Sequence, residues 1–523
     1  MITSVRIKNL RSLADTDFVE IKPITLLLGA NSSGKSTFLR SFPLFTQSVN
    51  KNLRGPISWF DDSLVDFGDY NTAINRFANP KDKIQFYYRV RLPFNVHYIS
   101  PDIHSTEKLL KKAQNLSVSF SLSNDSKGTY ISSVKYGMED VMISLSIQDR
   151  SGKITFAVND VKVNVGDVAI KWNTTSSINI LPSFEHSDRN QTQTWVRRGV
   201  FSFFRKNIYD FVKGRSDKRL KKFSRVEALI DKWDFSREVY LKWLKNDSPI
   251  PSFRKNVEDW TVDHDDFLEL YNQIALYKLL PLWDDIDMEL VTFYITCSYI
   301  APTRAEANRY YRTQGLQVDD IDPYGKNLQE FISSLTPAML NSYNQYTQKT
   351  LGIQARTKTD TGHQSIMVLN ERGEYNITDV GFGYSQILPI VTKLWYAVNK
   401  RQMRKRRMYF PGENGESVIL MEQPELHLHP AYQAKIADAF VNSITQKKEK
   451  NESLRLIIET HSDTILNRIG RRVREGAIKP QDVNIILFEK KFGEPTTQLR
   501  QTTFNDKGQI EAWPYGFFDP IDE

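Results

Sequence analysis

Residues 20–37 read EIKPITLLLGANSSGKST, and this stretch decides the fold class of the chain. Residues 20–28 are a nearly continuous apolar run, which predicts a strand buried on both faces. The run meets GANSSGKS at 29–36, which matches the pattern G-x-x-x-x-G-K-[ST], and FLRSFPLF follows with the character of a helix start. A strand, a glycine-bounded loop and a helix in this order predict an α/β domain with a phosphate-binding loop.

The loop residues suit a bound nucleotide. Glycines let backbone N–H groups close around phosphates, and the N-terminus of the following helix adds a positive end. Lys35 supplies charge to the β and γ phosphates, and Ser36 offers a hydroxyl to Mg²⁺. The alternative is an ordinary turn with a solvated lysine, but the flanking strand and helix favour a nucleotide site. The predicted contacts to ATP are Asn31, Ser32, Ser33, Gly34, Lys35, Ser36 and Thr37.

Composition narrows the class of protein. The 523 residues allow two or three domains, and 40% apolar with 25% charged residues favours a packed core over disorder. The single cysteine, Cys297, excludes a disulfide framework. The N-terminus has no apolar signal core and no run approaches a membrane span, so a cytoplasmic protein without a membrane partner is expected. The net charge of +8 permits an acidic partner such as nucleic acid.

The pattern along the chain divides into four segments. Residues 1–82 hold the phosphate loop, and residues 83–165 alternate apolar and polar positions between turn signals, which predicts an antiparallel β lobe. Residues 166–295 are predicted to form a helical insertion that is basic and aromatic. Residues 296–523 return to short apolar strands with helices between them. The whole predicts an α/β head with a mostly parallel sheet, interrupted by the β lobe and the helices.

The stretch VILMEQPELHLHP, at 418–430, delivers an acid to the end of an apolar strand. Beside a phosphate loop, Glu422 is predicted to hold Mg²⁺ through water. Gln423 occupies the position where many ATPases carry a second carboxylate. Three alternatives follow: Gln423 orients the attacking water, Glu425 acts as the base, or the protein holds ATP and barely hydrolyses it.

Two further segments complete the predicted site. LRLIIETHS, at 454–462, ends a second strand at His461, which places this histidine at the ligand-binding edge of an open sheet, unless it is an ordinary strand-end histidine. ITDVGFGYSQILPI, at 377–390, combines a glycine-rich turn with Ser385 at a helix start. Such an element can bind an anion, although a plain loop and cap is the alternative.

Taken together, these motifs resemble those of ABC-type ATPases of the RecF/SMC/OLD superfamily, and the tail at 506–519 resembles a domain attached to AAA-type bacterial ATPases of this kind. The resemblance covers the two ends of the chain. The motifs that carry it are IKNLRS (7–12), GANSSGKS (29–36), DVGFGYSQILP (379–389), ILMEQPELHLHP (419–430) and IIETHSD (457–463).

The resemblance implies an ABC-ATPase head and a site completed by two chains. ATP and Mg²⁺ would lie between two heads, with the signature loop of Gly383 and Ser385 reaching the γ-phosphate bound to the partner. Arg11 and Ser12 would lie near the nucleotide, and His461 would match the switch histidine. At least a homodimer is therefore expected.

The resemblance also suggests a biological role. Compact relatives without a long coiled coil, such as Septu-type ATPases, occur in bacterial anti-phage defence, where an ATPase dimer senses infection and controls a separately encoded effector, with a nuclease as one candidate. Only 62 residues follow His461 and they lack a clustered acid set, so a nuclease domain in this chain is not expected. A RecF-like DNA repair ATPase and a nucleotide-stabilised scaffold are the alternatives.

Direct DNA binding depends on residues 197–225. This segment holds 11 Arg and Lys with only two acids, interleaved with aromatic residues, a mixture that suits backbone phosphates and stacked bases. A solvated helix face over an aromatic core explains the same pattern. Both interpretations stay open at the level of sequence.

Overall fold

The computed structural model describes residues 1–51, 53, 55–92, 116–147, 154–163, 168–171, 179–186, 193–216, 223–313, 318, 320–403, 416–490 and 496–512. The sequence FGEP at 492–495, which favours a turn between the last two strands, lies outside these residues. The chain divides into two compact units. The first comprises Met1–Arg6, Ser48–Ile57 and Lys81–Val291, and the second comprises Ile7–Gln47, Ser58–Pro80 and Thr292–Glu523.

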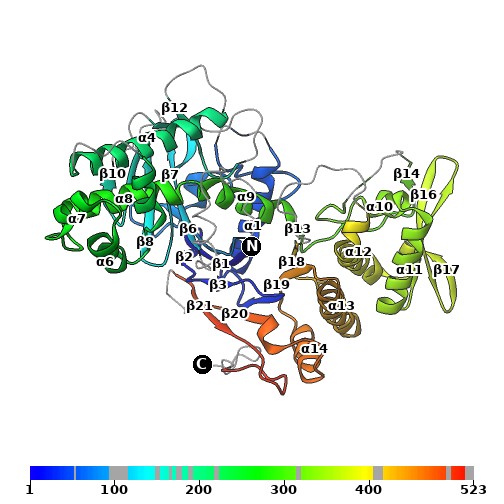
Figure 1. Ribbon diagram of the computed structural model, residues 1–523. Coiled ribbons are helices and arrows are strands. Elements are labelled where there is room, and N and C mark those ends of the chain that lie inside the picture. The colour runs from blue at the N-terminus through cyan, green and yellow to red at the C-terminus, as the bar shows by residue number, and fades with distance from the viewer. Residues whose placement is uncertain are drawn as a thin grey trace. The chain divides into compact units, whose positions relative to one another are not determined.

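The second unit is built on a mostly parallel sheet, as predicted (Figure 1). Its strands are ordered β13-β18-β19-β4-β20-β21, and only the pairing of β20 with β21 is antiparallel in this order. The strand bounds are β13 Cys297–Ile300, β18 Glu416–Glu422, β19 Ser453–Glu459, β4 Ile24–Gly29, β20 Val483–Glu489 and β21 Gln498–Thr502. Every residue of β4 is buried, which confirms the strand predicted from its apolar run.

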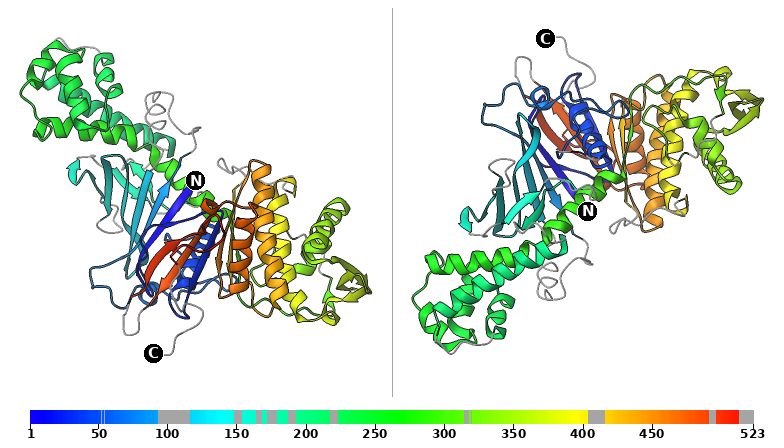
Figure 2. Two further views of the ribbon diagram at one scale, coloured as in Figure 1. Left: turned by 90° about the horizontal axis from the view of Figure 1, so that it is seen from below. Right: turned by 90° about the horizontal axis from the view of Figure 1, so that it is seen from above.

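Helices cover both faces of this sheet. On one face α1 (Lys35–Val49) packs through Phe38 against Phe488 of β20. On the other face lie α12 (Phe382–Met403), α13 (Pro430–Glu449) and α14 (Asp463–Arg474), which Figure 2 shows side by side. Helices were expected between the short apolar strands of residues 296–523, and α13, between β18 and β19, confirms one of them.

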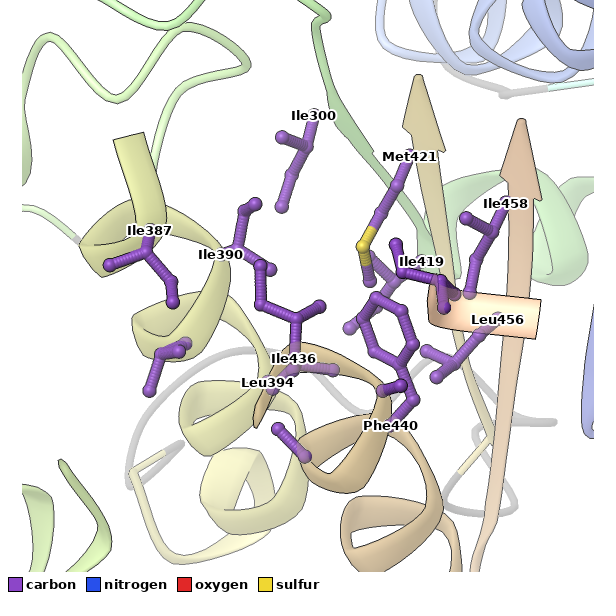
Figure 3. Close-up of a cluster of buried hydrophobic side chains, with 14 of the residues drawn as sticks. Ile300, Ile387, Ile390, Leu394, Ile419, Met421, Ile436, Phe440, Leu456 and Ile458 are labelled. Atoms are coloured by element: carbon purple, nitrogen blue, oxygen red, sulfur yellow. The ribbon is translucent and has the colours of Figure 1, made fainter. Parts of the chain in front are cut away.

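Figure 3 shows part of the apolar core between the sheet and these helices. Ile387 and Ile390 of α12 and Phe440 of α13 face Met421 of β18 and Ile458 of β19. Burial of apolar surface is worth about 25 cal/mol per Å², so this cluster contributes a large share of the stability of the sheet edge. The core thereby fixes the strand ends that carry the polar residues of the candidate site.

Short elements complete the second unit. The end of β1 (Ile2–Leu10) pairs with β2 (Leu13–Asp15), and a small antiparallel sheet forms from segments between 311 and 376. The remaining elements are β3 Val19–Glu20, α2 Tyr70–Ala73, β14 Tyr311–Arg312, α10 Leu328–Ser334, α11 Pro337–Leu351, β15 Gln354–Asp360, β16 His363–Asn370 and β17 Gly373–Asn376.

The first unit contains the predicted antiparallel β lobe and helices. Its sheet follows the order β10-β9-β8-β7-β6-β5, and two short strands, β11 and β12, pair separately within the range where helices were expected. The strands are β5 Ile84–Val90, β6 Leu116–Asp125, β7 Gly128–Met138, β8 Val141–Ile147, β9 Ile154–Val158, β10 Val161–Val163, β11 Val168–Lys171 and β12 Ser183–His186. The helices are α4 Gln193–Gly214, α5 Ser224–Asp231, α6 Arg237–Asp247, α7 Pro251–Val257, α8 Asp265–Leu279 and α9 Leu282–Thr296, which ends in the second unit.

Candidate nucleotide-binding site

The loop between β4 and α1 has the backbone that its glycines predict. Gly29 has φ 154° and Gly34 has φ 99°, conformations that favour glycine. A Cβ on Gly29 would lie 2.5 Å from the carbonyl oxygen of Phe488, and one on Gly34 would lie 2.7 Å from Oγ of Ser12. Larger residues are therefore excluded at both positions, and Ser12 stands directly beside the loop.

Lys35 is buried within this loop. Its Nζ donates to the carbonyl oxygens of Gly29 (2.9 Å) and Ala30 (2.8 Å). Burial lowers the pKa of Lys35, while the nearby charges of Glu459 and Glu425 oppose that shift. The ammonium is thus fixed at the loop by weak neutral acceptors, which a polyphosphate can replace.

The other loop residues differ in exposure. Asn31 and Ser32 are exposed, and Ser32 adopts φ 61°. Ser33 is buried, and its Oγ has no hydrogen-bond partner among the described residues. Thr37 is half-buried in the first turn of α1. Exposed loop residues next to an unsatisfied hydroxyl fit a loop that receives an anion.

Ser36 contacts an acid that the sequence reasoning did not select. Its Oγ donates to Oε1 of Glu459, the last residue of β19, at 2.9 Å. Burial, followed by the charge of Glu422, raises the pKa of Glu459 to about 7. Because β19 is the strand next to β4, the end of this strand meets the first turn of α1.

Glu422, the acid predicted at the end of β18, has other partners. Its Oε1 accepts from Nε of Arg40 and from the hydroxyl of Tyr299, both at 2.7 Å, and its Oε2 accepts from the second guanidinium nitrogen of Arg40 at 2.7 Å. This bidentate bond raises the pKa of Arg40, and burial beside the carboxylate raises the pKa of Tyr299. The role of Glu422 at Mg²⁺ stays a prediction.

The residues after Glu422 join the two strand ends. The N–H of Gln423 donates to the carbonyl oxygen of Glu459 at 2.8 Å, with Gln423 at φ 43°. Glu425 accepts from Oγ1 of Thr460 (2.8 Å) and from the N–H of His461 (2.7 Å). Burial raises the pKa of Glu425, and burial with the charge of Lys35 lowers the pKa of His461. Glu425 therefore ties the loop after β18 to the strand end that carries His461.

Arg11 lies on the same side of the unit as the phosphate loop. Its guanidinium carbon is 4.2 Å from the ring centroid of Phe67, and one of its nitrogens donates to the carbonyl oxygen of Asp66 at 3.0 Å. Burial and the charge of Arg40 lower the pKa of Arg11. The charge of Asp66 opposes this shift, and a guanidinium held near Arg40 fits a position near phosphates.

The predicted signature residues form the first turn of α12. Ser385 donates to the carbonyl oxygen of Phe382 at 2.7 Å, and Gly383 faces the side chain of Leu428. The described contacts of these two residues are thus with their own helix and with the loop after β18, rather than with the phosphate loop.

The donor set fits ATP and Mg²⁺. The site offers loop N–H groups and Lys35 for phosphates, and a hydroxyl with carboxylate oxygens for a hard divalent cation. Within the described residues, three or more His, Cys, Asp or Glu side chains nowhere gather as a metal site. The sequence reasoning missed Glu459, Arg40 and Tyr299; for Glu459 the signal was present, because LRLIIE ends in a carboxylate as VILME does.

Comparisons with solved structures find SMC head domains. One is the crystal structure of the SmcHead bound to the C-winged helix domain of ScpA, with 10% identity, a TM-score of 0.33, and coverage of 96% of this chain and 98% of that chain. Another is the SMC head domain from Thermotoga maritima, with 7% identity, a TM-score of 0.32, and coverage of 95% and 98%. Both TM-scores are low, so neither neighbour bears on the function of this chain.

No curated protein matches the sequence. None of the helices in the described part of the chain has the length and apolar character needed to cross a bilayer. A family model described as "AAA domain, putative AbiEii toxin, Type IV TA system" matches residues 24–467. The match confirms the AAA-type ATPase that the motifs predicted. Since it spans most of the sequence, this chain belongs to that AAA domain family.

Proposed function

We propose that this protein binds ATP with Mg²⁺ at the ends of β4, β18 and β19 and hydrolyses it slowly. The observation that carries the proposal is the junction of the phosphate loop with two strand-end carboxylates, in which Ser36 already bonds to one of them. Membership of an AAA family supports the nucleotide. Lys35 and the loop N–H groups hold the phosphates, and Mg²⁺, when bound, neutralises charge on the β and γ oxygens.

The water-activating residue is Gln423 or Glu425. Both oxygens of Glu425 already accept bonds from the end of β19, at Thr460 and His461, so this carboxylate has a bracing role in the structure. Gln423 is held by its backbone at the same junction, and an amide can orient a water molecule as in some GTPases. These contacts support Gln423 as the water-orienting residue, with Glu425 positioning His461.

We further propose that two copies of the chain enclose the nucleotide. Phe382, in the signature segment, is 46% exposed, and its ring packs edge-on against His427 at 5.4 Å between centroids. An exposed aromatic side chain beside an anion-binding helix start suits the surface of a partner head. Ser385 would then act on the nucleotide of the partner copy.

The biological role that we propose is control of a separate effector in bacterial anti-phage defence. The family description names a putative toxin of a type IV toxin–antitoxin system, which supports a function exercised together with a second component. The effector, a nuclease among the candidates, and the trigger belong to this proposal.

Direct DNA binding is the weaker alternative. In α4, Phe204 and Phe211 are buried rather than offered to bases. Arg205 pairs with Glu227, and Arg215 pairs with Asp266 and stacks on Phe211. These contacts favour a helix face over an aromatic core. Residues 217–222 of the basic segment lie outside the described residues.

An ATPase assay on the purified full chain tests the proposal. Wild type should turn ATP over slowly, and Lys35→Ala should abolish turnover. Gln423→Ala should lower it at least about tenfold, whereas Glu425→Gln keeps a larger part of it. Wild-type turnover equal to that of Lys35→Ala would contradict hydrolysis and favour the nucleotide-stabilised scaffold.

Light scattering with a slowly hydrolysed ATP analogue tests the dimer. Mass should double on nucleotide addition for wild type and stay at one chain for Phe382→Asp, although this variant still binds the nucleotide. The exposed Phe77→Asp, at 68% exposure, is the matched control and should dimerise as wild type does.

A further inference from the structure

The end of β19 holds a buried carboxylate, and one of its oxygens has no hydrogen-bond partner among the described residues. Glu459 is 3% exposed, and its Oε1 accepts the hydroxyl of Ser36 at 2.9 Å. Its Oε2 is buried and has no hydrogen-bond partner among the described residues. Buried carboxylate oxygens normally accept hydrogen bonds, so an oxygen that accepts none is expected to bind a ligand.

Glu422 is the direct comparison, because it faces Glu459 in the register of β18 and β19. Arg40 and Tyr299 supply three hydrogen bonds to Glu422. A guanidinium in bidentate contact neutralises a carboxylate and removes most of its need for a cation. Of the two strand-end acids, Glu459 is therefore the one whose charge lacks a bonded cation.

Lys35 is the other cation near Glu459 among the described residues, but it does not bond to this carboxylate. Lys35 lies near Glu459, but its Nζ donates to the carbonyl oxygens of Gly29 and Ala30. Two carboxylates side by side in a buried position repel each other, and a divalent cation relieves that cost. Carboxylate and hydroxyl oxygens are the ligands that Mg²⁺ prefers.

We propose that Glu459 and Ser36 together form the Mg²⁺-binding pair of this site, and that Glu459 sets the affinity for the metal. A serine hydroxyl that gives its lone pair to a metal retains a proton to donate, and Glu459 already accepts that proton. Glu422, in contrast, braces Arg40 and the end of β18. This inference rests on the proposed binding of ATP.

The test measures nucleotide binding as a function of Mg²⁺, without turnover. A fluorescent, slowly hydrolysed ATP analogue is titrated first in EDTA and then at rising Mg²⁺. The Mg²⁺ midpoint is the Mg²⁺ concentration at which half of the metal-dependent gain in analogue affinity is reached. For Glu459→Gln this midpoint should rise about tenfold or more. Affinity in EDTA should stay equal or become tighter, because a negative charge near the phosphates is removed.

Two comparison variants make the result specific. Glu422→Gln should raise the Mg²⁺ midpoint less than Glu459→Gln does. Glu489 ends β20, on the other side of β4, and pairs with Arg500, so Glu489→Gln should leave the midpoint within about twofold. Mn²⁺ replacing Mg²⁺ gives a second readout: electron paramagnetic resonance should show fewer bound ions per chain for Glu459→Gln.

The outcomes separate the two claims. The metal role of Glu459 would be overturned by an unchanged Mg²⁺ midpoint in Glu459→Gln or by a larger shift in Glu422→Gln. It would also be overturned if Glu459→Gln lost the same analogue affinity with and without metal. Failure of wild type to bind the analogue at all would instead sink the proposed function. If Glu459→Gln does not fold, Glu459→Asp keeps the charge on a shorter side chain and should still raise the midpoint.

Discussion

The ends of β18 and β19 present the same residue type at paired positions, yet their surroundings differ. Glu422 forms an ion pair with Arg40 and accepts a hydrogen bond from Tyr299, whereas Glu459 accepts from Ser36 with one oxygen and its other oxygen has no hydrogen-bond partner among the described residues. The first arrangement resembles a structural ion pair and the second resembles a ligand site. The position of an acid at a strand end therefore does not settle its role; its hydrogen-bond partners do.

The largest expected effect on stability comes from removing the guanidinium of Arg40, which pairs with Glu422. Arg40→Ala leaves a carboxylate with 3% side-chain exposure without its counter-charge, and such a change costs about 3 kcal/mol in the free energy of unfolding. Urea denaturation of the nucleotide-free chain measures it. The control is Arg309→Ala, whose pair with Asp379 is half exposed, and which should cost less than about 1 kcal/mol. Equal losses in the two variants would mean that Glu422 is not a structural partner.

The next effect concerns the pH dependence at Glu459. Its pKa is raised from 4.5 to about 7 in the folded state, so between these values the folded chain holds a proton that the unfolded chain has released. Stability therefore falls as pH rises through this window, by about 2 kcal/mol between pH 5.5 and 7.5. Comparing wild type with Glu459→Gln by unfolding at several pH values isolates this contribution.

Glu459→Gln should lack this loss of stability between pH 5.5 and 7.5. It should therefore be more stable than wild type at pH 7.5 without metal. A parallel pH profile for the two proteins would show that Glu459 keeps an ordinary pKa in the folded chain.

A smaller effect is expected at Tyr299, the second partner of Glu422. Tyr299→Phe removes one hydroxyl that donates to the buried carboxylate but keeps the ring, so the loss should be about 1.5 kcal/mol. Thermal unfolding of wild type and variant gives the number. Tyr375→Phe, at an exposed tyrosine, is the control and should be neutral within about 0.5 kcal/mol. A neutral Tyr299→Phe would leave Arg40 as the sole stabilising partner.

The smallest effect lies at the link between the two strand ends. Gln423 adopts φ 43° while its N–H bonds to Glu459. Glycine tolerates this conformation and alanine does not, so Gln423→Gly should be more stable than Gln423→Ala by roughly 0.5 to 1 kcal/mol. The reverse order in unfolding experiments would mean that the turn relaxes when the side chain is lost.

Short sequence motifs predicted those parts of the site that lie within one continuous segment of the chain. The phosphate loop, the strand ending at Glu422 and the strand before His461 each follow from a short motif, and β4, α1, β18 and β19 confirm the elements that carry them. The four-segment division is finer than the two units of the structure and stays a prediction.

Long-range pairing could not be predicted in the same way. Arg40 lies 382 positions from Glu422 and Tyr299 lies 123 positions from it, so no spacing rule connects them. The small sheet of β14 to β17 was also missed, because strands such as β15 are largely exposed and lack an apolar alternation. Glu459 was overlooked although its strand carries the same signal as that of Glu422.

The most direct test of the central claim is equilibrium binding of ATP with Mg²⁺ to the full chain, measured for wild type and Lys35→Ala by calorimetry. Lys35 lies in the loop, where the charges of Glu459 and Glu425 act on it. Wild type should bind, and Lys35→Ala should bind at least about 100-fold more weakly, because a buried charge-assisted contact to phosphate is lost. Equal affinity in the two proteins would place the nucleotide elsewhere and contradict the site described at β4, β18 and β19.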